Sequence, residues 1–509
     1  MSPPKYPREG LLLATIFMLC GLEFLQVGMI TFAAGPIFGQ AAGSPEEFTL
    51  ATVVYAVFAI ASLSHQRWLV ERMGWRGFLQ MSVAVYIAGA AICANSSAFA
   101  VFLAGRAVMG LGGGQFLTAA RVTVNLIPPS PRRFRGILAF AGALTVGNGL
   151  APWVASLAVS HGSASWIFVT LAVLAAIAGA LGTLALPADI VPVEKRSQGH
   201  PLLVLVMMAG TFLTLYALLR APYDFFSRGP VLLLMLIAGI GGLLYFGLHQ
   251  HRHEHPLLVL KRLMIPRYVA GIATFTLGYM VLGANNYMFP VLMQGGLGFS
   301  WEVSGKVQTA GLIAAVPTFA IMAMVLKRNQ SAKKFYVTGF AFLTLSSLLL
   351  VRLNPEANLW TDVWPGIAVF GAFITPVMVT TALHSFMDLM GDEVAFANGQ
   401  QLKNMMSQFG VSLGSAGAAL FLQWRSSAHL SALVERFAPG DAVFNGVAGQ
   451  LSEQFSASYG AQAAQAATAT LAQQVSQQAV LLSSLDFFGF LVGLGLLGAT
   501  VMMAQRILK

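Results

Sequence analysis

The stretch Ala98-Phe-Ala-Val-Phe-Leu-Ala-Gly-Arg106-Ala-Val-Met-Gly-Leu-Gly-Gly-Gly114, with the segment that follows it to Val159, decides how this chain folds. An almost uncharged apolar run carries Arg106 near its middle and ends in glycines. A basic turn over residues 128–135 then leads into a second apolar run rich in small residues. An arginine at mid-membrane depth is costly and is functional by default, while small residues and a proline let a helix pack closely and bend. The pattern predicts two membrane-spanning helices joined by a basic hinge, which is typical of transport machinery.

Composition indicates that the rest of the chain is membrane-embedded as well. Of the 509 residues, 57% are hydrophobic and 9% are charged, and the mean hydropathy is +0.72. Soluble domains carry about 25% charged residues, which argues strongly against a soluble enzyme. Crossing a bilayer takes about 20 apolar residues. Fourteen runs of the chain qualify, at roughly 11–36, 48–65, 77–95, 98–120, 137–159, 165–187, 201–219, 229–248, 267–290, 306–326, 334–352, 363–384, 399–422 and 483–505.

The net charge of +10 follows the predicted topology. When the spans alternate from a cytoplasmic N-terminus, 20 Lys and Arg residues fall inside and five outside. This asymmetry is the positive-inside rule, so it predicts a multi-pass protein of the bacterial inner (plasma) membrane with both termini in the cytoplasm. The excess charge is therefore a topology signal, and we expect no nucleic-acid partner. The first apolar run is too long for a signal peptide and should be retained as the first span.

We expect neither a metal nor a cofactor. Cys20 and Cys93 fall inside predicted spans and form no disulfide framework or metal motif. The alternating histidines of 249–255 lie at a membrane interface and fit a metal site poorly. No phosphate-binding loop is visible, which argues against ATP as an energy source.

The spans divide as 6 + 2 + 6. We expect an N-terminal six-helix bundle over 1–187, cytoplasmic linkers with two extra spans over 188–266, and a C-terminal six-helix bundle over 267–509. The second bundle contains one long outer loop, 424–480, whose Ala- and Gln-rich second half, Gly460 to Val480, is predicted to be helical. A loop of this length in a compact protein indicates a function.

Glu23 is the sharpest functional candidate. It lies in the first predicted span, with Gln26 three residues on and therefore on the same helical face. A carboxylate at mid-span must be paired, neutralised or exposed to a water-filled cavity, so Glu23 is suited to loading and releasing protons. The alternative is a glutamate hydrogen-bonded in the bundle for structure alone.

Arg106 and Lys403 are the candidate cations. Arg106 keeps its proton, so we expect it to organise a polar network near a carboxylate such as Glu23; the alternative is a structural arginine bonded to carbonyls of broken helices. Lys403 either lines the cavity or snorkels to the cytoplasmic interface. Its neighbours on the predicted polar face are Gln400, Gln401, Asn404 and Gln408.

A polar and aromatic patch in the ninth predicted span is suited to organic ligands, although such patches more often serve packing. It comprises Tyr279, Asn285, Asn286 and Tyr287. Near the outer end of the tenth predicted span, Glu302 and Lys306 are four residues apart and are expected to form an ordinary interfacial pair.

These residues resemble the major facilitator superfamily, in particular its fourteen-span drug:proton antiporters of the EmrB/QacA type, over essentially the whole chain. Leu22 to Pro36 is similar to the first-helix motif, with Glu23 where the family usually has Asp. Arg67 to Arg76 is similar to the cytoplasmic loop motif, and Arg67 stands at its leading Gly. The remaining matches in that loop, to which the resemblance gives a role in packing and gating, are Glu71, Arg72, Gly74 and Arg76.

Further motifs follow in the family's order. Arg106 to Gly110 is similar to the fourth-helix arginine motif that is linked to proton coupling. The segment 147–156 resembles the fifth-helix antiporter motif, through Gly147, Asn148, Ala151 and Pro152. Asn404 matches in the thirteenth span, where Ser407 replaces an expected arginine. The stretch 471–486 is similar to the outer loop of tripartite-pump members.

The resemblance implies an all-α, fourteen-helix major facilitator fold with a central cavity between two bundles. It implies a non-enzymatic, proton-coupled antiporter that exports amphipathic organic compounds by alternating access, with Glu23 and Arg106 coupling protons. The cavity residues it implies are Gln26, Asn148, Asn285, Asn286, Tyr287, Lys403, Asn404 and Gln408. If the outer loop docks a periplasmic adaptor, an outer-membrane channel completes a tripartite pump. A proton-coupled importer and a non-transporting scaffold remain open alternatives.

Overall fold

The protein is a helical bundle throughout the part that the structure describes. The computed structural model describes residues 9–41, 45–128, 131–188, 201–253, 256–326, 331–389, 391–436 and 442–508. Helices satisfy every backbone hydrogen bond within one segment, which lipid requires. The predicted all-α class is confirmed. The elements are α1 (Glu9–Phe32), α2 (Ala34–Ala41), α3 (Pro45–Ala94), α4 (Phe99–Gly113), α5 (Phe116–Asn125), α6 (Pro131–Ser160), α7 (Ser165–Ala185), α8 (Pro201–Arg252), α9 (Leu260–Leu263), α10 (Pro266–Pro290), η2 (Val291–Gly296), α11 (Trp301–Leu312), α12 (Ala315–Leu326), α13 (Ala332–Leu350), η3 (Leu359–Val363), α14 (Trp364–His384), η4 (Met387–Leu389), α15 (Glu393–Arg436), α16 (Ala442–Tyr459), η5 (Gly460–Gln462) and α17 (Ala463–Ala504).

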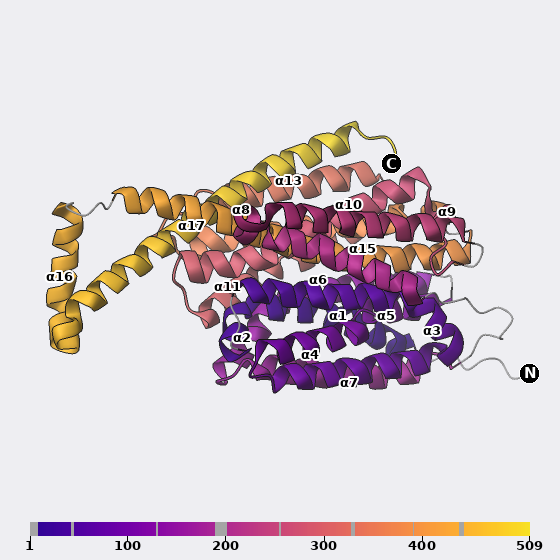
Figure 1. Ribbon diagram of the computed structural model, residues 1–509. Coiled ribbons are helices and arrows are strands. Elements are labelled where there is room, and N and C mark those ends of the chain that lie inside the picture. The colour runs from indigo at the N-terminus through magenta and orange to yellow at the C-terminus, as the bar shows by residue number, and fades with distance from the viewer. Residues whose placement is uncertain are drawn as a thin grey trace, which may run out of the picture.

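The long helices run side by side in two groups. Helices α1 to α7 lie together, and the helices from α10 onward form the second group beside them (Figure 1). The two groups meet along α6 and α11, along α3 and α15, and along α1 and α10. Surfaces where two helical groups of a membrane protein meet are common places for binding sites.

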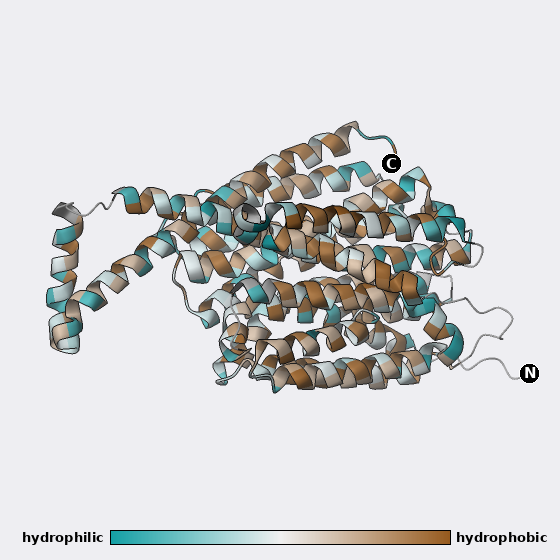
Figure 2. Cartoon of the chain, in the orientation of Figure 1, coloured by the Kyte–Doolittle hydropathy of each residue, from teal (hydrophilic) through white to brown (hydrophobic). Residues whose placement is uncertain are grey.

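The hydropathy of the helices matches a membrane environment. Large apolar side chains are exposed along the outer helices, for example Leu234 and Ile237 on α8 and Leu497 on α17. Hydrophobic residues cover the middle of the bundle, whereas hydrophilic residues gather at its ends and on α16 (Figure 2). Exposed apolar surface on this scale is favourable against lipid and would be a liability in water.

The number of spans can be compared directly with the prediction. Within the described residues, twelve helical segments are long and apolar enough to cross a membrane. One of them, Leu50–Ala94, has 45 residues and covers two predicted spans, and α13 lies where the span 334–352 was predicted. Fourteen spans therefore remain a prediction. The protein is a multi-pass membrane protein.

The predicted cytoplasmic loop Arg67 to Arg76 is helical apart from one break. Gly74 interrupts α3 with φ 70° and ψ 164°, a left-handed conformation that a side chain would strain. The chain turns there, so both halves of α3 pack on α4. A Cβ added to Gly110 would meet the Tyr55 carbonyl in the first half, and one added to Gly112 would meet the Ser82 carbonyl in the second half. The linker predicted over 188–200 and the N-terminal residues 1–8 lie outside the described residues, apart from residue 188.

Helix α8 contains the two extra spans. Its φ of −133° at Arg228 breaks the helix, and the two arms fold back on each other. They approach at Gly210 and Gly239, where a Cβ on Gly239 would lie 2.5 Å from the Thr214 hydroxyl. The first arm packs on both α3 and α15, through apolar side chains that include Leu63, Val204, Met207, Leu215, Met405 and Ala416. The pair therefore covers one side of the junction between the two groups.

The segment predicted as a long outer loop with a helical second half forms a helical extension. Helix α15 continues to Arg436, and α17 begins at Ala463, so the described part of 424–480 is helical almost throughout. Figure 1 shows α16 apart from the bundle, joined to it by the projecting ends of α15 and α17. A helix was predicted only for the second half, Gly460 to Val480, and η5 and α17 confirm it. The helices of the first half were missed because that part contains no long unbroken apolar run. Its Ala, Gln and Ser residues favour or tolerate a helix without favouring lipid.

Candidate functional site

Glu23 lies at the contact between the two groups of helices. Its side chain projects from α1, is 2% exposed, and accepts a 2.5 Å hydrogen bond at Oε1 from Nε2 of Gln408 on α15. An ionised carboxylate away from water needs strong donors, and a charge-assisted hydrogen bond is among the strongest available. One carboxylate in the first group is thus held by an amide from the second.

The second partner of Glu23 is Tyr55. The Tyr55 hydroxyl, on α3, donates to Oε2 of Glu23 at 3.3 Å. Arg106, on α4, places its guanidinium carbon 4.4 Å from the centre of the Tyr55 ring. The arginine therefore makes a cation–π contact with the ring of the tyrosine whose hydroxyl donates to the carboxylate. Sequence reasoning placed Arg106 near Glu23 but did not identify Tyr55.

Glycines bring this network together. A Cβ on Gly110 would lie 2.4 Å from the Tyr55 carbonyl oxygen, and a Cβ on Gly113 would lie 2.5 Å from the Tyr55 hydroxyl. Only glycine allows α4 and α3 to approach this closely. The glycine run after Arg106 therefore fixes Tyr55 between the arginine and Glu23.

A small cavity adjoins the carboxylate. Side chains from both groups line it, among them Glu23, Asn148, Asn286 and Gln408. The two asparagines are themselves joined across the groups, because Nδ2 of Asn286 donates to Oδ1 of Asn148 at 3.2 Å. Four predicted site residues are therefore gathered at one place in the described structure.

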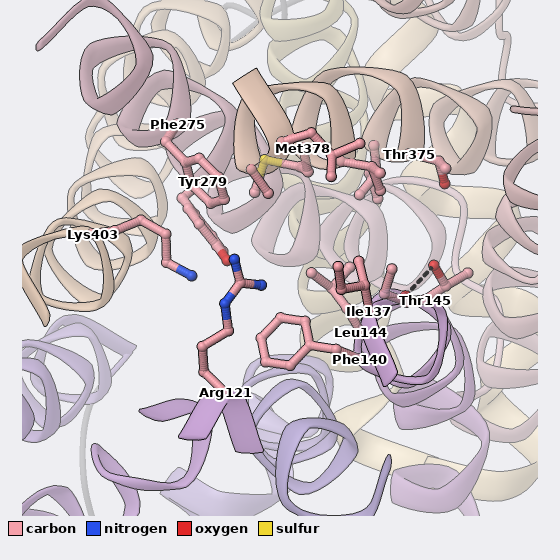
Figure 3. Close-up of a pocket in the computed structure, with 15 residues that line it drawn as sticks. Arg121, Ile137, Phe140, Leu144, Thr145, Phe275, Tyr279, Thr375, Met378 and Lys403 are labelled. Atoms are coloured by element: carbon pink, nitrogen blue, oxygen red, sulfur yellow. Dashed lines mark hydrogen bonds between the residues drawn. The ribbon is translucent and has the colours of Figure 1, made fainter. Parts of the chain in front are cut away.

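A second cavity lies next to the first and shares Tyr279 with it. It is lined by α5, α6, α10, α14 and α15, so both groups contribute. Figure 3 shows Arg121 and Lys403 pointing into it, with Phe140, Phe275 and Tyr279 around them. Lys403 is 4% exposed, and it faces this cavity. The sequence left two options for Lys403, and this geometry favours lining the cavity over snorkelling to the membrane interface.

The remaining predicted cavity residues are buried or half-buried but line neither cavity. Nδ2 of Asn285 donates to the Val281 carbonyl of its own helix, and Asn404 donates to the Thr118 hydroxyl across the groups at 2.7 Å. Gln26 is fully buried on α1, and Tyr287 is half-buried on α10. A direct role in binding substrate stays a prediction for these four.

The loop motif forms a local cluster at one end of the bundle. Nε of Arg67 and Oε1 of Glu71 form a 2.7 Å ion pair. Arg72 lies over the Trp68 ring at 4.1 Å and donates to the Trp68 carbonyl. Arg76 donates from Nε to the Leu186 carbonyl at the end of α7. The arginine at the motif's first position is thus accommodated by its own glutamate.

The fifth-helix motif lies against α1 in this structure. A Cβ on Gly147 would lie 2.5 Å from the Gly21 carbonyl oxygen, and a Cβ on Gly28 would meet the Cβ of Ala151 at 2.4 Å. Pro152 lies inside α6, and its carbonyl approaches Gly305 of α11. Small residues therefore set the distance from α6 both to the helix that carries Glu23 and to the opposite group.

Arg121 and Tyr55 are the functional candidates that sequence reasoning missed. Arg121 is a charge at the end of a predicted span, and that signal was present but was assigned no role. Tyr55 gave no signal, because a single tyrosine in an apolar run is usual in a packed helix.

Comparison with known proteins agrees with this architecture. The sequence profile of the Major Facilitator Superfamily matches residues 16–415. The chain belongs to the major facilitator superfamily. Relatives named MdtD, a name that assigns them provisionally to multidrug resistance, include those of Escherichia coli O1:K1 / APEC and Shigella sonnei (strain Ss046). Each is 26% identical, and each match covers 79% of this chain and 84% of the relative.

Solved structures show the same fold. A bacterial homologue of the human lysosomal transporter Spinster, inward-facing and unoccupied, matches with a TM-score of 0.59 at 14% identity, over 99% of both chains. A bacterial homologue of the human drug peptide transporters PepT1 and PepT2 matches with a TM-score of 0.60 at 13% identity, over 98% of both chains. At these identities the likeness concerns the fold alone.

Proposed function

We propose that this transporter is a proton-coupled antiporter that exports amphipathic organic compounds by alternating access. One observation carries the proposal: a buried carboxylate, Glu23, bridges the two groups of helices through Gln408, directly beside a cavity that both groups line. A group that gains or loses a proton at such a junction alters a contact that must break when the halves rock apart. The names of the MdtD relatives support export of drug-like compounds.

The proposed cycle uses the two protonation states of Glu23. In the charged state, Gln408 and Tyr55 hold the carboxylate across the junction. A proton from the outer side weakens this charge-assisted contact and favours release of substrate outward. Loss of the proton toward the cytoplasm restores the contact and the substrate-accepting state. Arg106, through Tyr55, favours the charged state.

The proposal includes the organisation and the partners inferred from the sequence. The two six-helix units would be 1–187 and 267–509, with the α8 pair in the middle region 188–266, and both termini would face the cytoplasm. The projecting helices over 424–480 would dock a periplasmic adaptor that leads to an outer-membrane channel, with the bilayer surrounding the bundle. Their outer ends extend beyond the other helices, which supports this role (Figure 1). The energy source would be the proton gradient, with no cofactor, metal or enzymatic step.

Flux in liposomes tests the proposed function. Purified protein is reconstituted, the interior is made acidic, and uptake of a panel of organic cations and acids is followed. An antiporter exchanges internal protons for external compound, so we expect accumulation that collapses with the pH gradient. Accumulation only when the exterior is acidic would favour the importer alternative, and no accumulation under either gradient would favour the scaffold.

A further inference from the structure

The cavity between α5, α6, α10, α14 and α15 contains two cations and no anion. Fifteen residues line it, and none of them is acidic. Arg121 reaches it from α5 in one group and Lys403 from α15 in the other, and their charged ends point into the same space (Figure 3). Substrate cavities usually combine apolar walls with a few convergent polar groups, and here both charged groups have the same sign.

Neither cation has a charged partner among the described residues. Their contacts are aromatic: the Arg121 guanidinium carbon lies 5.6 Å from the Phe140 ring centre, and Nζ of Lys403 lies 5.8 Å from the same ring. Nζ of Lys403 also lies 5.2 Å from the Phe275 ring centre. Cation–π contacts compensate a buried charge less well than a carboxylate does. Because both cations contact the Phe140 ring and neither has an anionic partner among the described residues, the cavity carries an uncompensated positive charge.

The obvious carboxylate is already engaged elsewhere. Glu23 lines the adjoining cavity, where Gln408 and Tyr55 donate to it. Tyr279 is common to both cavities, whereas Glu23 lines only the first and the two cations only the second. Among the described residues, no carboxylate is therefore left to supply a counter-charge to Arg121 and Lys403.

The other walls indicate what that molecule looks like. Phe140, Phe275 and Tyr279 present aromatic surface, and Met378 and Ile374 add apolar surface. Thr145 and Thr375 direct their hydroxyls to carbonyls of the protein itself. Apart from the two cations, the cavity thus offers few free polar groups to a ligand.

We propose that this cavity binds amphipathic organic anions, such as aromatic carboxylates, with the anionic group between Arg121 and Lys403 and the apolar body against Phe140 and Phe275. This inference rests on the proposed function, because it names the substrate class of the same transport pathway. An anion relieves the repulsion between the two cations, whereas a cation of the same shape adds to it. We therefore expect the cavity to discriminate between ligands of similar shape by their charge.

Binding of three probes that differ in charge tests this assignment. Purified full-length protein is titrated by calorimetry at neutral pH with 1-naphthylacetate, its neutral amide 1-naphthylacetamide, and the cation 1-naphthylmethylammonium. We expect the anion to bind at least about tenfold more tightly than the amide, and the cation most weakly. In Arg121→Gln and in Lys403→Gln we expect the anion to lose about tenfold in affinity while the amide changes little.

Controls separate a binding effect from misfolding. Lys306→Gln removes a cation that is paired with Glu302 on the exposed outer end of α11, so it should leave all three affinities unchanged. Elution as a single species and an unaltered unfolding temperature confirm that the two cavity variants fold. The amide provides a second check, because a collapsed cavity would lose it as well.

Several results would overturn the assignment: equal binding of the three probes, preference for the cation, failure of all three to bind, or anion binding that survives both cavity substitutions. Each of these would leave the proposed antiport standing if another compound still gives gradient-driven accumulation in liposomes. Conversely, selective anion binding without any accumulation would support the cavity assignment and count against the transport proposal.

Discussion

Replacing Gly147 with alanine places a methyl group in a tight backbone contact between α6 and α1. The new Cβ would lie 2.5 Å from the Gly21 carbonyl oxygen and 3.1 Å from its Cα. An ordinary C···O contact is about 3.3 Å or longer, so α1 must move by roughly 0.8 Å. Both neighbouring atoms belong to the backbone, and therefore no side-chain rotation can relieve the clash.

The expected cost follows from two opposing terms. Overpacking a tight contact costs about 1–3 kcal/mol, while exchanging glycine for alanine in a helix returns up to about 1 kcal/mol. A Cβ added to Gly142 on the same helix would meet no atom within 4 Å, so Gly142→Ala gains the second term alone. The free energies of unfolding of the two variants should therefore differ by about 1–3 kcal/mol, with Gly147→Ala the less stable.

The shift also reaches the proposed coupling site. Glu23 follows Gly21 by two residues on α1, and its hydrogen bond to Gln408 is 2.5 Å long. A movement of roughly 0.8 Å takes this bond beyond good geometry, so Gly147→Ala should weaken gradient-driven accumulation in liposomes and Gly142→Ala should not. Equal stability of the two variants in denaturant titrations, or equal transport, would refute the packing argument.

Three further predictions concern other contacts. Gln408→Leu should destabilise the protein by about 1–3 kcal/mol, and by less when Glu23 is already replaced by Gln. A double-mutant cycle of unfolding free energies measures this difference, and additive effects would contradict the hydrogen bond between Gln408 and Glu23. Asp486→Asn removes the anion that Arg425 and His429 share at 2.6 Å between α15 and α17. Hydrogen exchange over 442–480 should therefore quicken about fivefold, corresponding to about 1 kcal/mol for these part-exposed groups; unchanged exchange would count against this clamp. Hydrogen bonds from the backbone amides of Ala395 and Val394, together with Arg262, hold the pKa of Asp392 below its ordinary 3.8. The carboxylate therefore stabilises α15 fully above pH 3.8 and loses this effect as pH falls through its lowered pKa. Asp392→Asn should be less stable than wild type at pH 7, and the difference should narrow in acid; a difference in unfolding temperature that does not vary with pH would exclude this role.

The sequence was sufficient for the features that rest on charge inside apolar runs. Glu23 and Arg106 are conspicuous because charges in a membrane are expensive, and the structure places them one tyrosine apart. The apolar runs likewise indicated where the helices lie. Such signals depend on single positions and need no knowledge of what packs against them.

Features that depend on pairing between distant segments could not be predicted in this way. Tyr55 gains its place only because Gly110 and Gly113 let α4 approach it. Arg121 lies 282 positions before Lys403, and only the folded chain brings both to Phe140. The helices over 424–459 were missed for another reason: polar residues interrupt their apolar ones, so a search for long apolar runs treats them as a loop.

Proton release by purified protein tests the central claim most directly. Substrates identified by liposome flux are added to wild type, to Glu23→Gln, and to Glu302→Gln, which removes an exposed carboxylate on α11. We expect a substrate-linked change in bound protons in wild type and in Glu302→Gln, and none in Glu23→Gln, which should still bind the compound. A proton signal of full size in Glu23→Gln would contradict the account, because coupling would then reside at another group.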